Sequence, residues 1–362
     1  GPLARNGRFE YTLAKGERGL LLRDFNLDGF SAYVPLLPGE WSGTLAGAKL
    51  AGNVAKLRYA WKGDWQKPVS WQGEADLRGL DMGLPRWLPH MGKLDVVASF
   101  DEKKGTARLA SKAFKLDYPE QFTEPLILDK LDAVFEWKRV AAGWEISTRG
   151  LELSNKEAAV SLGATYRWTG KDLGYVDLKG EISRMPANRV YAYLPRAVGD
   201  DTLVWLKDSL RAGRAGNGKA EWRGEVARFP YADGSGRFRI TADARDVTLS
   251  YANGWPAITS IDGQLIFDGP GMTIHAPRAR IFDVELKDIE TRIPDLSEHQ
   301  HVLVDGKAQG ATSGFLRFVQ QSPVKESTQG FLDTLKAEGK GQLELKLDIP
   351  LDDTDLSKVS GN

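Results

Sequence analysis

The sequence predicts a mostly β protein: an elongated, curved antiparallel β-sheet groove with two short helix pairs and a repeat-like organisation. Apolar and polar side chains alternate with a period of two along most of the 362 residues. Such alternation gives each strand one apolar and one polar face, as is typical of antiparallel sheets. The 39 glycines exceed the usual share, and glycine-containing turn sequences separate the alternating runs.

The strands are predicted from alternating segments taken in chain order. Turn sequences such as Lys62–Asp64 and Asp268–Gly271 separate them at the spacing of a meander. In the last run, aliphatic residues alternate with Glu344, Lys346 and Asp348. The clearest runs are 69–77, 94–100, 131–137, 160–168, 220–226 and 343–349.

Helical periodicity is confined to two pairs of short segments. In one of them, Val204, Leu206 and Leu210 are predicted to share one helix face. Each pair follows an alternating strand and leads through glycines into another, which indicates an internal repeat; the alternative is chance similarity between amphipathic helix pairs. We therefore expect a first segment over residues 1–170 and a continuous repeat segment over 171–362. The predicted helices are 187–194 and 202–210, then 312–320 and 328–337.

Composition excludes several classes of function. Lys and Arg together number 49, as do Asp and Glu, so there is no basic surplus for a nucleic-acid partner. The absence of cysteine excludes disulfides, thiolate metal sites and a cysteine nucleophile. The Gly1-Pro2 start, without an initiator methionine, is typical of a protease-cleavage remnant. We therefore expect the natural protein to begin earlier, which leaves open an anchor before residue 1.

The search for chemical sites predicts no catalytic residue, no metal and no cofactor. His299 and His301 would share a face on a strand and could hold a metal, but a polar loop is the favoured interpretation. Nucleophile-elbow and phosphate-binding glycine motifs do not occur. Trp41, Trp61 and Trp65 could form a sugar-binding platform, although a strand-face core is favoured.

An apolar helix and the strands around it carry a family resemblance. The segment 312–320 includes Phe315 and Phe318 and is expected to plug the end of a sheet, the alternative being contact with lipid. Residues Arg184–Pro195 with Trp205–Leu210, and the related residues from Gly306 to Gln321, resemble the central region of YhdP-type, AsmA-like proteins. The ending Gly339–Leu351 is similar to the repeating strand closure of that family.

The resemblance implies a non-enzymatic role in outer membrane biogenesis of Gram-negative bacteria. It implies a periplasmic protein anchored in the inner membrane, with phospholipids as cargo and the inner and outer membranes as partners at its two ends. Such proteins are expected to shield phospholipid acyl chains in a long apolar β-groove.

Strand parity selects the residues expected to line such a groove. An error of one residue in the register of a strand would place its selected residues on the opposite face of the sheet. The same apolar faces could instead fill a closed sandwich or barrel. The expected lining residues are Val176, Leu178, Phe238, Ile240, Val247, Leu249, Ile261, Leu265, Phe267, Leu343, Leu345, Leu347 and Ile349.

Two other functions remain open from the residues alone. An envelope-assembly scaffold could bind partner proteins along an exposed strand edge. A carbohydrate-binding β protein could use the tryptophans named above. If the chain is a scaffold, a pull-down should recover an envelope protein without lipid. If it binds carbohydrate, oligosaccharides should quench its intrinsic fluorescence.

Overall fold

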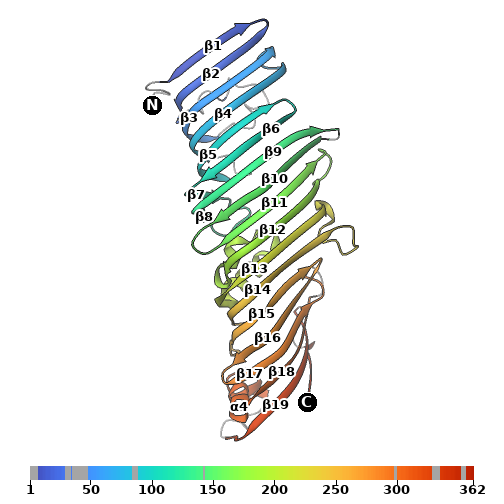
Figure 1. The fold of residues 1–362 in the computed structure, drawn as a ribbon. Helices are drawn as coiled ribbons and strands as arrows, with labels where there is room; N and C mark the ends of the chain where they lie inside the picture. Colours follow the sequence, from blue (N-terminus) through green and yellow to red (C-terminus); the bar gives the residue numbers. More distant parts are fainter. Residues whose placement is uncertain are drawn as a thin grey trace. The chain divides into compact units, whose positions relative to one another are not determined.

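The computed structural model describes residues 7–28, 34, 48–83, 89–141, 143–296, 300–327, 335–351 and 356–362. Its 20 strands belong to one antiparallel sheet, with few short helices (Figure 1). The sheet is open, because in the described chain β1 pairs only with β2 and β20 only with β19. The predicted fold class, mostly β with an open antiparallel sheet, is confirmed.

The chain divides into two compact units, residues 1–178 with 195–197 and residues 179–194 with 198–362. This division does not test the predicted segments 1–170 and 171–362, which stay a prediction. The strands of the first unit are β1 (Arg8–Ala14), β2 (Glu17–Asn26), β3 (Lys49–Gly63), β4 (Pro68–Gly83), β5 (His90–Asp101), β6 (Lys104–Ser111), β7 (Phe114–Asp117), β8 (Leu126–Leu128), β9 (Lys130–Val140), β10 (Gly143–Ser154) and β11 (Ala159–Trp168).

The strand β12 (Tyr175–Pro186) contributes residues to both units. The other strands of the second unit are β13 (Leu210–Glu225), β14 (Arg237–Leu249), β15 (Ile258–Asp268), β16 (Gly271–Ile281), β17 (Val284–Ile293), β18 (His301–Ala311), β19 (Lys340–Pro350) and β20 (Lys358–Gly361). Its helical segments are η2 (Ala187–Arg189), α2 (Val190–Tyr193), α3 (Asp200–Ser209), η4 (Val226–Arg228), α4 (Thr312–Gln320) and α5 (Val324–Ser327), while η3 (Arg196–Val198) adjoins the first unit.

The first unit is a meander in which neighbours in sequence are neighbours in the sheet. β5 pairs with both β6 and β7, while β6 pairs with β9 and β7 with β8. β6 with β7, and β8 with β9, are therefore each one interrupted strand. The turns that join β1 to β2, β3 to β4, β5 to β6, β9 to β10 and β11 to β12 lie along one edge, which we call the turn edge.

The order strand, helices, strand occurs twice in the second unit, from β12 to β13 and from β18 to β19. The predicted helices at 187–194, 202–210 and 312–320 are confirmed within a residue or two at their ends. The predicted helix 328–337 lies outside the described residues up to 334, and residues 335–337 are not helical. A short helix, α5, precedes that segment instead.

One prediction about a helix face is wrong. Val204 is 59% exposed, whereas Leu203 is 2% exposed and packs with Tyr191 and Ala192 of α2. The buried face of α3 therefore runs through Leu203 and Leu206, which are three residues apart as neighbours on one helix face must be. Asp200 and Asp201 in the first turn of α3 favour its start through the helix dipole.

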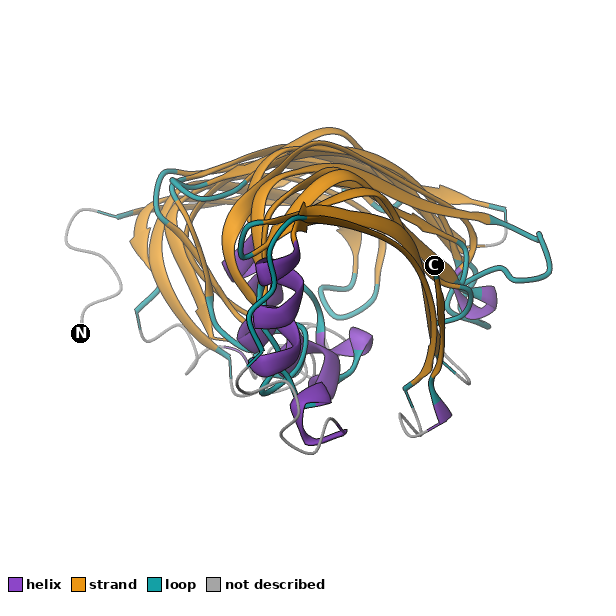
Figure 2. Cartoon of the chain, turned by 90° about the horizontal axis from the view of Figure 1, so that it is seen from below, coloured by secondary structure: helices purple, strands orange, loops and turns teal. Residues whose placement is uncertain are grey.

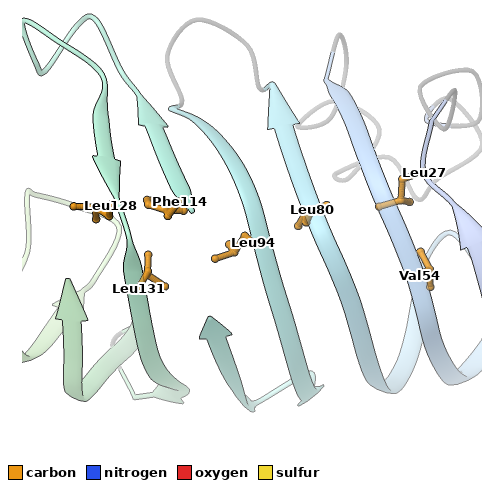
Figure 3. Packing of buried hydrophobic residues seen from close by; sticks show 7 residues of the cluster. All are labelled: Leu27, Val54, Leu80, Leu94, Phe114, Leu128 and Leu131. Carbon is orange, nitrogen blue, oxygen red and sulfur yellow. The ribbon is translucent and has the colours of Figure 1, made fainter. Parts of the chain in front are cut away.

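The core of the first unit is a row of aliphatic and aromatic side chains rather than a thick interior. The buried residues run across successive strands, and Leu80 is the register partner of Leu94 (Figure 3). Phe114 is likewise opposite Leu128. The remaining members of the row are Leu27, Val54 and Leu131.

Candidate functional site

Register in the second unit assembles one continuous apolar face. Leu265 of β15 is opposite Ala242 of β14 and Ile274 of β16. Thr291 of β17 continues the row to Val304 of β18. Residues directly opposite each other in a sheet point to the same side. The row across these strands, which we call the apolar row, is Ala242, Leu265, Ile274, Thr291, Val304 and Leu347.

The neighbouring row, one residue away on each strand, has the opposite chemistry. His275 Nδ1 lies 3.1 Å from Glu290 Oε2, and Lys346 Nζ lies 3.1 Å from Asp305 Oδ2. Arg292, two strand positions from Glu290, adds a further ion pair at 2.9 Å. These side chains point to the opposite face, so one side of the unit is aliphatic and the other is charged and largely ion-paired.

Eleven of the thirteen residues predicted to line a groove lie on β14, β15 and β19, and register places all eleven on the apolar face. Leu347 and Leu265 are in the apolar row itself. Ile240 is opposite Phe267, and Leu343 is opposite Ala308. The others follow the same alternation: Phe238, Val247, Leu249, Ile261, Leu345 and Ile349.

A β-bulge keeps β14 on this face along its whole length. Register shifts between Ala244 and Val247, where Asp246 has a left-handed φ of 49°. Ile240 and Val247 are an odd number of residues apart and would point to opposite sides of a regular strand. The extra residue of the bulge brings them to the same side. The other two predicted residues, Val176 and Leu178, lie on β12.

This face is covered only in part. Val176 and Val247 are each 8% exposed, whereas the other eleven predicted residues are half-buried. A filled core between two layers would bury nearly all of them. The half-buried state instead leaves apolar surface on the face that another apolar body could contact.

Helix α4 covers one end of the apolar face. A methyl group added at Gly341 would lie 3.2 Å from the Phe315 ring, so that ring rests on the backbone of β19. Gly314 similarly approaches Val284 Cγ2 at the start of β17. The helices of this unit lie mainly on the concave side of the bent strands (Figure 2). These contacts favour the predicted role of α4 as an end plug and identify the apolar face as the concave one.

Several residues of the apolar face were missed from the sequence. Ile274, Met272 and Val304 occupy its rungs but were not selected. The signal for Val304 was weak, because Leu303 lies between Val302 and Val304 and interrupts the alternation in β18. On β16, Pro277 and Arg278 interrupt the alternation, and only pairing with β15 and β17 reveals the face.

In the first unit, one face carries an aliphatic row and an aromatic cluster. Leu57 of β3 is opposite Leu22 and Ala75. Nearer the turn edge, the rings of Tyr59 and Trp61 stack with centroids 5.5 Å apart. The members of this set, which we call the aromatic cluster, are Tyr11, Tyr59, Trp61, Trp65, Trp71 and Phe100.

Comparison with known proteins supplies the family. The model of the YhdP protein family matches residues 6–362, nearly the whole chain. The chain belongs to the YhdP family. The family resemblance expected from the two helix-containing repeats is therefore confirmed.

One relative of this YhdP-family chain is the intermembrane phospholipid transporter YhdP of Escherichia coli strain K12. The two are 24% identical over 274 residues, which cover 75% of this chain and 22% of the relative. The chain thus spans about a fifth of the length of that relative. No solved structure matches the chain significantly. None of the described helices is both long and apolar enough to cross a bilayer.

The three histidines that the structure describes in this YhdP-family chain each lie beside a carboxylate. His301 Nδ1 lies 2.8 Å from Asp348 Oδ1 across β18 and β19, and His90 Nε2 lies 2.5 Å from Asp81 Oδ1. His299 lies outside the described residues. Within the described ranges, no three His, Asp or Glu side chains are grouped so as to hold a metal ion.

A shallow hollow of about 610 Å³ lies on the charged face of the first unit, which carries Arg58 and Glu74 as register partners. Its walls include Glu145, which accepts from Lys138 and from Arg167 Nε at 2.7 Å. The hydrogen bond from Lys138, and then that from Arg167, holds the pKa of the Glu145 carboxyl below its usual range. Mutually paired charges of this kind make a solvated surface that is unsuited to hydrocarbon.

Trp61 lies in a strand-face core, the interpretation favoured over a sugar-binding platform. Trp61 is 6% exposed, and its ring centroid lies 4.9 Å from that of Trp65. Its indole face is therefore covered by other rings. Trp41 lies outside the described residues.

Proposed function

We propose that this chain is a segment of a phospholipid transport protein and that its apolar face shields acyl chains on their way between two membranes. The observation that carries the proposal is the apolar row across six strands, in which every residue but the buried Ala242 is half-buried, with a charged row one residue away on the opposite face. Membership of the YhdP family and the name of the E. coli relative, an intermembrane phospholipid transporter, support the choice of phospholipid as cargo.

Energetics explains why such a face would serve transport. Each methylene exposed to water costs about 0.8 kcal/mol, so two chains of about 16 carbons would cost on the order of 25 kcal/mol. Similar aliphatic rungs such as Leu265, Ile274 and Leu347 offset that cost about equally at each position. A cargo can then move from rung to rung without being trapped at one site.

The proposal extends to the surroundings of the protein. We place the segment in the periplasm, within a longer chain that is anchored in the inner membrane and reaches both membranes. The proposed role is transport rather than catalysis, because what the described residues offer is a face suited to hydrocarbon. The expected lining residues, Val176 and Leu178 of β12 included, are proposed to contact the acyl chains.

Leu345→Asp tests the proposal. Leu345 lies opposite Gly306 on the apolar face, so a carboxylate there would meet hydrocarbon. Gln342→Asp is the matched control, because Gln342 is an exposed residue of the same strand on the opposite face. We expect extracted lipid, measured by native mass spectrometry, to fall at least tenfold in Leu345→Asp and to stay unchanged in Gln342→Asp.

Both variants must also unfold at the same denaturant concentration as the wild type, so that a loss of lipid cannot be caused by a loss of stability. Equal lipid in the wild type and in Leu345→Asp would overturn the assignment of this face. Recovery of a partner protein without lipid would favour the scaffold alternative.

A further inference from the structure

The aromatic cluster of the first unit lies where the apolar face meets the turn edge. The rings of Tyr59 and Trp71 are 6.3 Å apart, and those of Trp71 and Phe100 are 5.9 Å apart. Trp65 lies in the turn between β3 and β4 and meets Tyr59 edge-on at 5.7 Å. Aromatic side chains with a polar atom favour boundaries that are apolar on one side and wet on the other.

One polar group in this cluster is buried and has no hydrogen-bond partner among the residues that the structure describes. Trp61 Nε1 is shielded from solvent and makes no hydrogen bond to any described residue. The indole N–H can only donate. Leaving a buried donor unsatisfied costs about 1–3 kcal/mol, so this group would be stabilised by an acceptor that the described residues do not supply.

A cation lies beside this donor. Arg18 of β2 is the register partner of Trp61, so the two side chains share a face. Its Nη1 donates to the carbonyl oxygen of Gly63. Arg18 forms no ion pair with a carboxylate among the residues that the structure describes. Most of the five guanidinium donors are therefore available to an anion.

Chemistry changes in order along β2 and β3, away from the turn edge. The first rung is Arg18 with Trp61, the next is Leu20 with Tyr59, and the third is Leu22 with Leu57. Successive rungs on one face are about 6.6–6.8 Å apart. The sequence of cation and N–H donor, aromatic ring, then aliphatic chain matches the phosphate, glycerol-ester and acyl regions of a phospholipid.

The turn edge carries charges of both signs. Lys15, Lys67, Lys103 and Lys171 lie in its turns, as do Asp64, Glu102 and Asp172. The net charge of this edge therefore does not select an anion, and Arg18 and Trp61 are the groups that favour a phosphate.

We propose that Arg18 and Trp61 form a headgroup subsite that binds the phosphate diester of a phospholipid, with its acyl chains directed toward Leu22 and Leu57. The inference rests on the proposed function and adds the orientation of the cargo in the first unit. Arg18 would neutralise the phosphate and the Trp61 N–H would donate to one of its oxygens. Tyr59 would contact the glycerol-ester region.

A soluble short-chain lipid tests the subsite. Delipidated protein is titrated with dihexanoyl-phosphatidylglycerol, and binding is followed by tryptophan fluorescence. Dihexanoylglycerol, which lacks the phosphate, and glycerophosphate, which lacks the chains, are the two comparison ligands. We expect Arg18→Gln to weaken binding of the phospholipid about tenfold and to leave dihexanoylglycerol binding unchanged. Trp61→Phe, which keeps an aromatic ring but loses the N–H, should weaken phospholipid binding several-fold.

Two matched variants separate charge from fold. Arg18→Lys keeps the charge and should recover most of the affinity. Arg23→Gln removes a cation from the opposite face of the same strand and should change nothing. Equal phospholipid affinity in Arg18→Gln and the wild type would overturn the subsite and leave the proposed function standing. Glycerophosphate that binds as tightly as the phospholipid would overturn the lipid assignment of the site. Failure of the wild type to bind any of the lipids would overturn both proposals.

Discussion

Leu347 of β19 is the antiparallel register partner of Val304 of β18, on the face that carries the apolar row. The preceding residue, Lys346, pairs with Asp305 on the other face. Because strand side chains alternate, a slip of one residue would exchange the aliphatic and the charged sets. The pairing of these two strands therefore decides which surface meets an acyl chain.

The register can be tested by a cross-strand disulfide in this cysteine-free chain. Directly opposed Cβ atoms lie about 4.5–5.5 Å apart, close to the geometry of a disulfide. We expect Val304→Cys with Leu347→Cys to form a bond on mild oxidation, measured by mass spectrometry. The control pair Leu303→Cys with Leu347→Cys points to opposite faces and should stay reduced; efficient bonding in that pair would mean a different register.

Gly105 lies beneath an aromatic ring and should not tolerate a side chain. A methyl group there would come within 2.5 Å of Trp137 Cε2 and 2.8 Å of Phe100 Cβ. Gly105→Ala is expected to lower the free energy of unfolding by about 1–3 kcal/mol, as overpacking does. Gly150→Ala, where a methyl would meet no described heavy atom within 4 Å, should be within about 1 kcal/mol of the wild type. Urea denaturation compares the two, and equal effects would contradict the packing described.

Leu203 anchors the helix pair of the second unit. Truncation of such a buried leucine leaves a cavity, so Leu203→Ala should destabilise the protein by about 2–5 kcal/mol. Val204→Ala, at the neighbouring exposed position, should cost less than about 0.5 kcal/mol. Thermal and urea unfolding followed by circular dichroism measure both variants. A larger loss of stability in Val204→Ala than in Leu203→Ala would support the helix face expected from the sequence instead.

Glu145 makes stability depend on pH in a defined direction. Its folded-state pKa is lowered, chiefly by the hydrogen bond from Lys138 and then by that from Arg167. The stabilisation is therefore present above the unfolded-state pKa of about 4.3 and is lost as pH falls through the folded-state value. Glu145→Gln should lower the free energy of unfolding by about 0.5–1 kcal/mol at pH 7. The difference from the wild type should shrink in urea titrations below about pH 4.

Glu136→Gln serves as the control for that prediction. Glu136 lies on the same charged face, opposite Ser147, and makes no ion pair among the described residues. Its substitution should have little effect at either pH. An equal loss at positions 136 and 145 would mean that the ion pairs of Glu145 are not the cause.

Prediction from the sequence succeeded where one local signal sufficed. The alternation around Leu345 and the turn at Asp268–Gly271 each define their element without reference to the rest of the chain. It failed at Val204, because three apolar residues in a short helix fit more than one face and only packing against Tyr191 selects one. It also missed Ile274, whose strand is recognisable only through its partners.

The sequence by itself determined the strand class, the two helix-bearing repeats and the absence of thiol chemistry, because these follow from local periodicity and composition. Tertiary structure alone decided that Arg18 adjoins Trp61, and that the bulge before Val247 keeps β14 on one face. Both depend on register, a relation between strands that no single strand encodes. Whether an apolar side chain is packed or left half-open is likewise set by what lies over it.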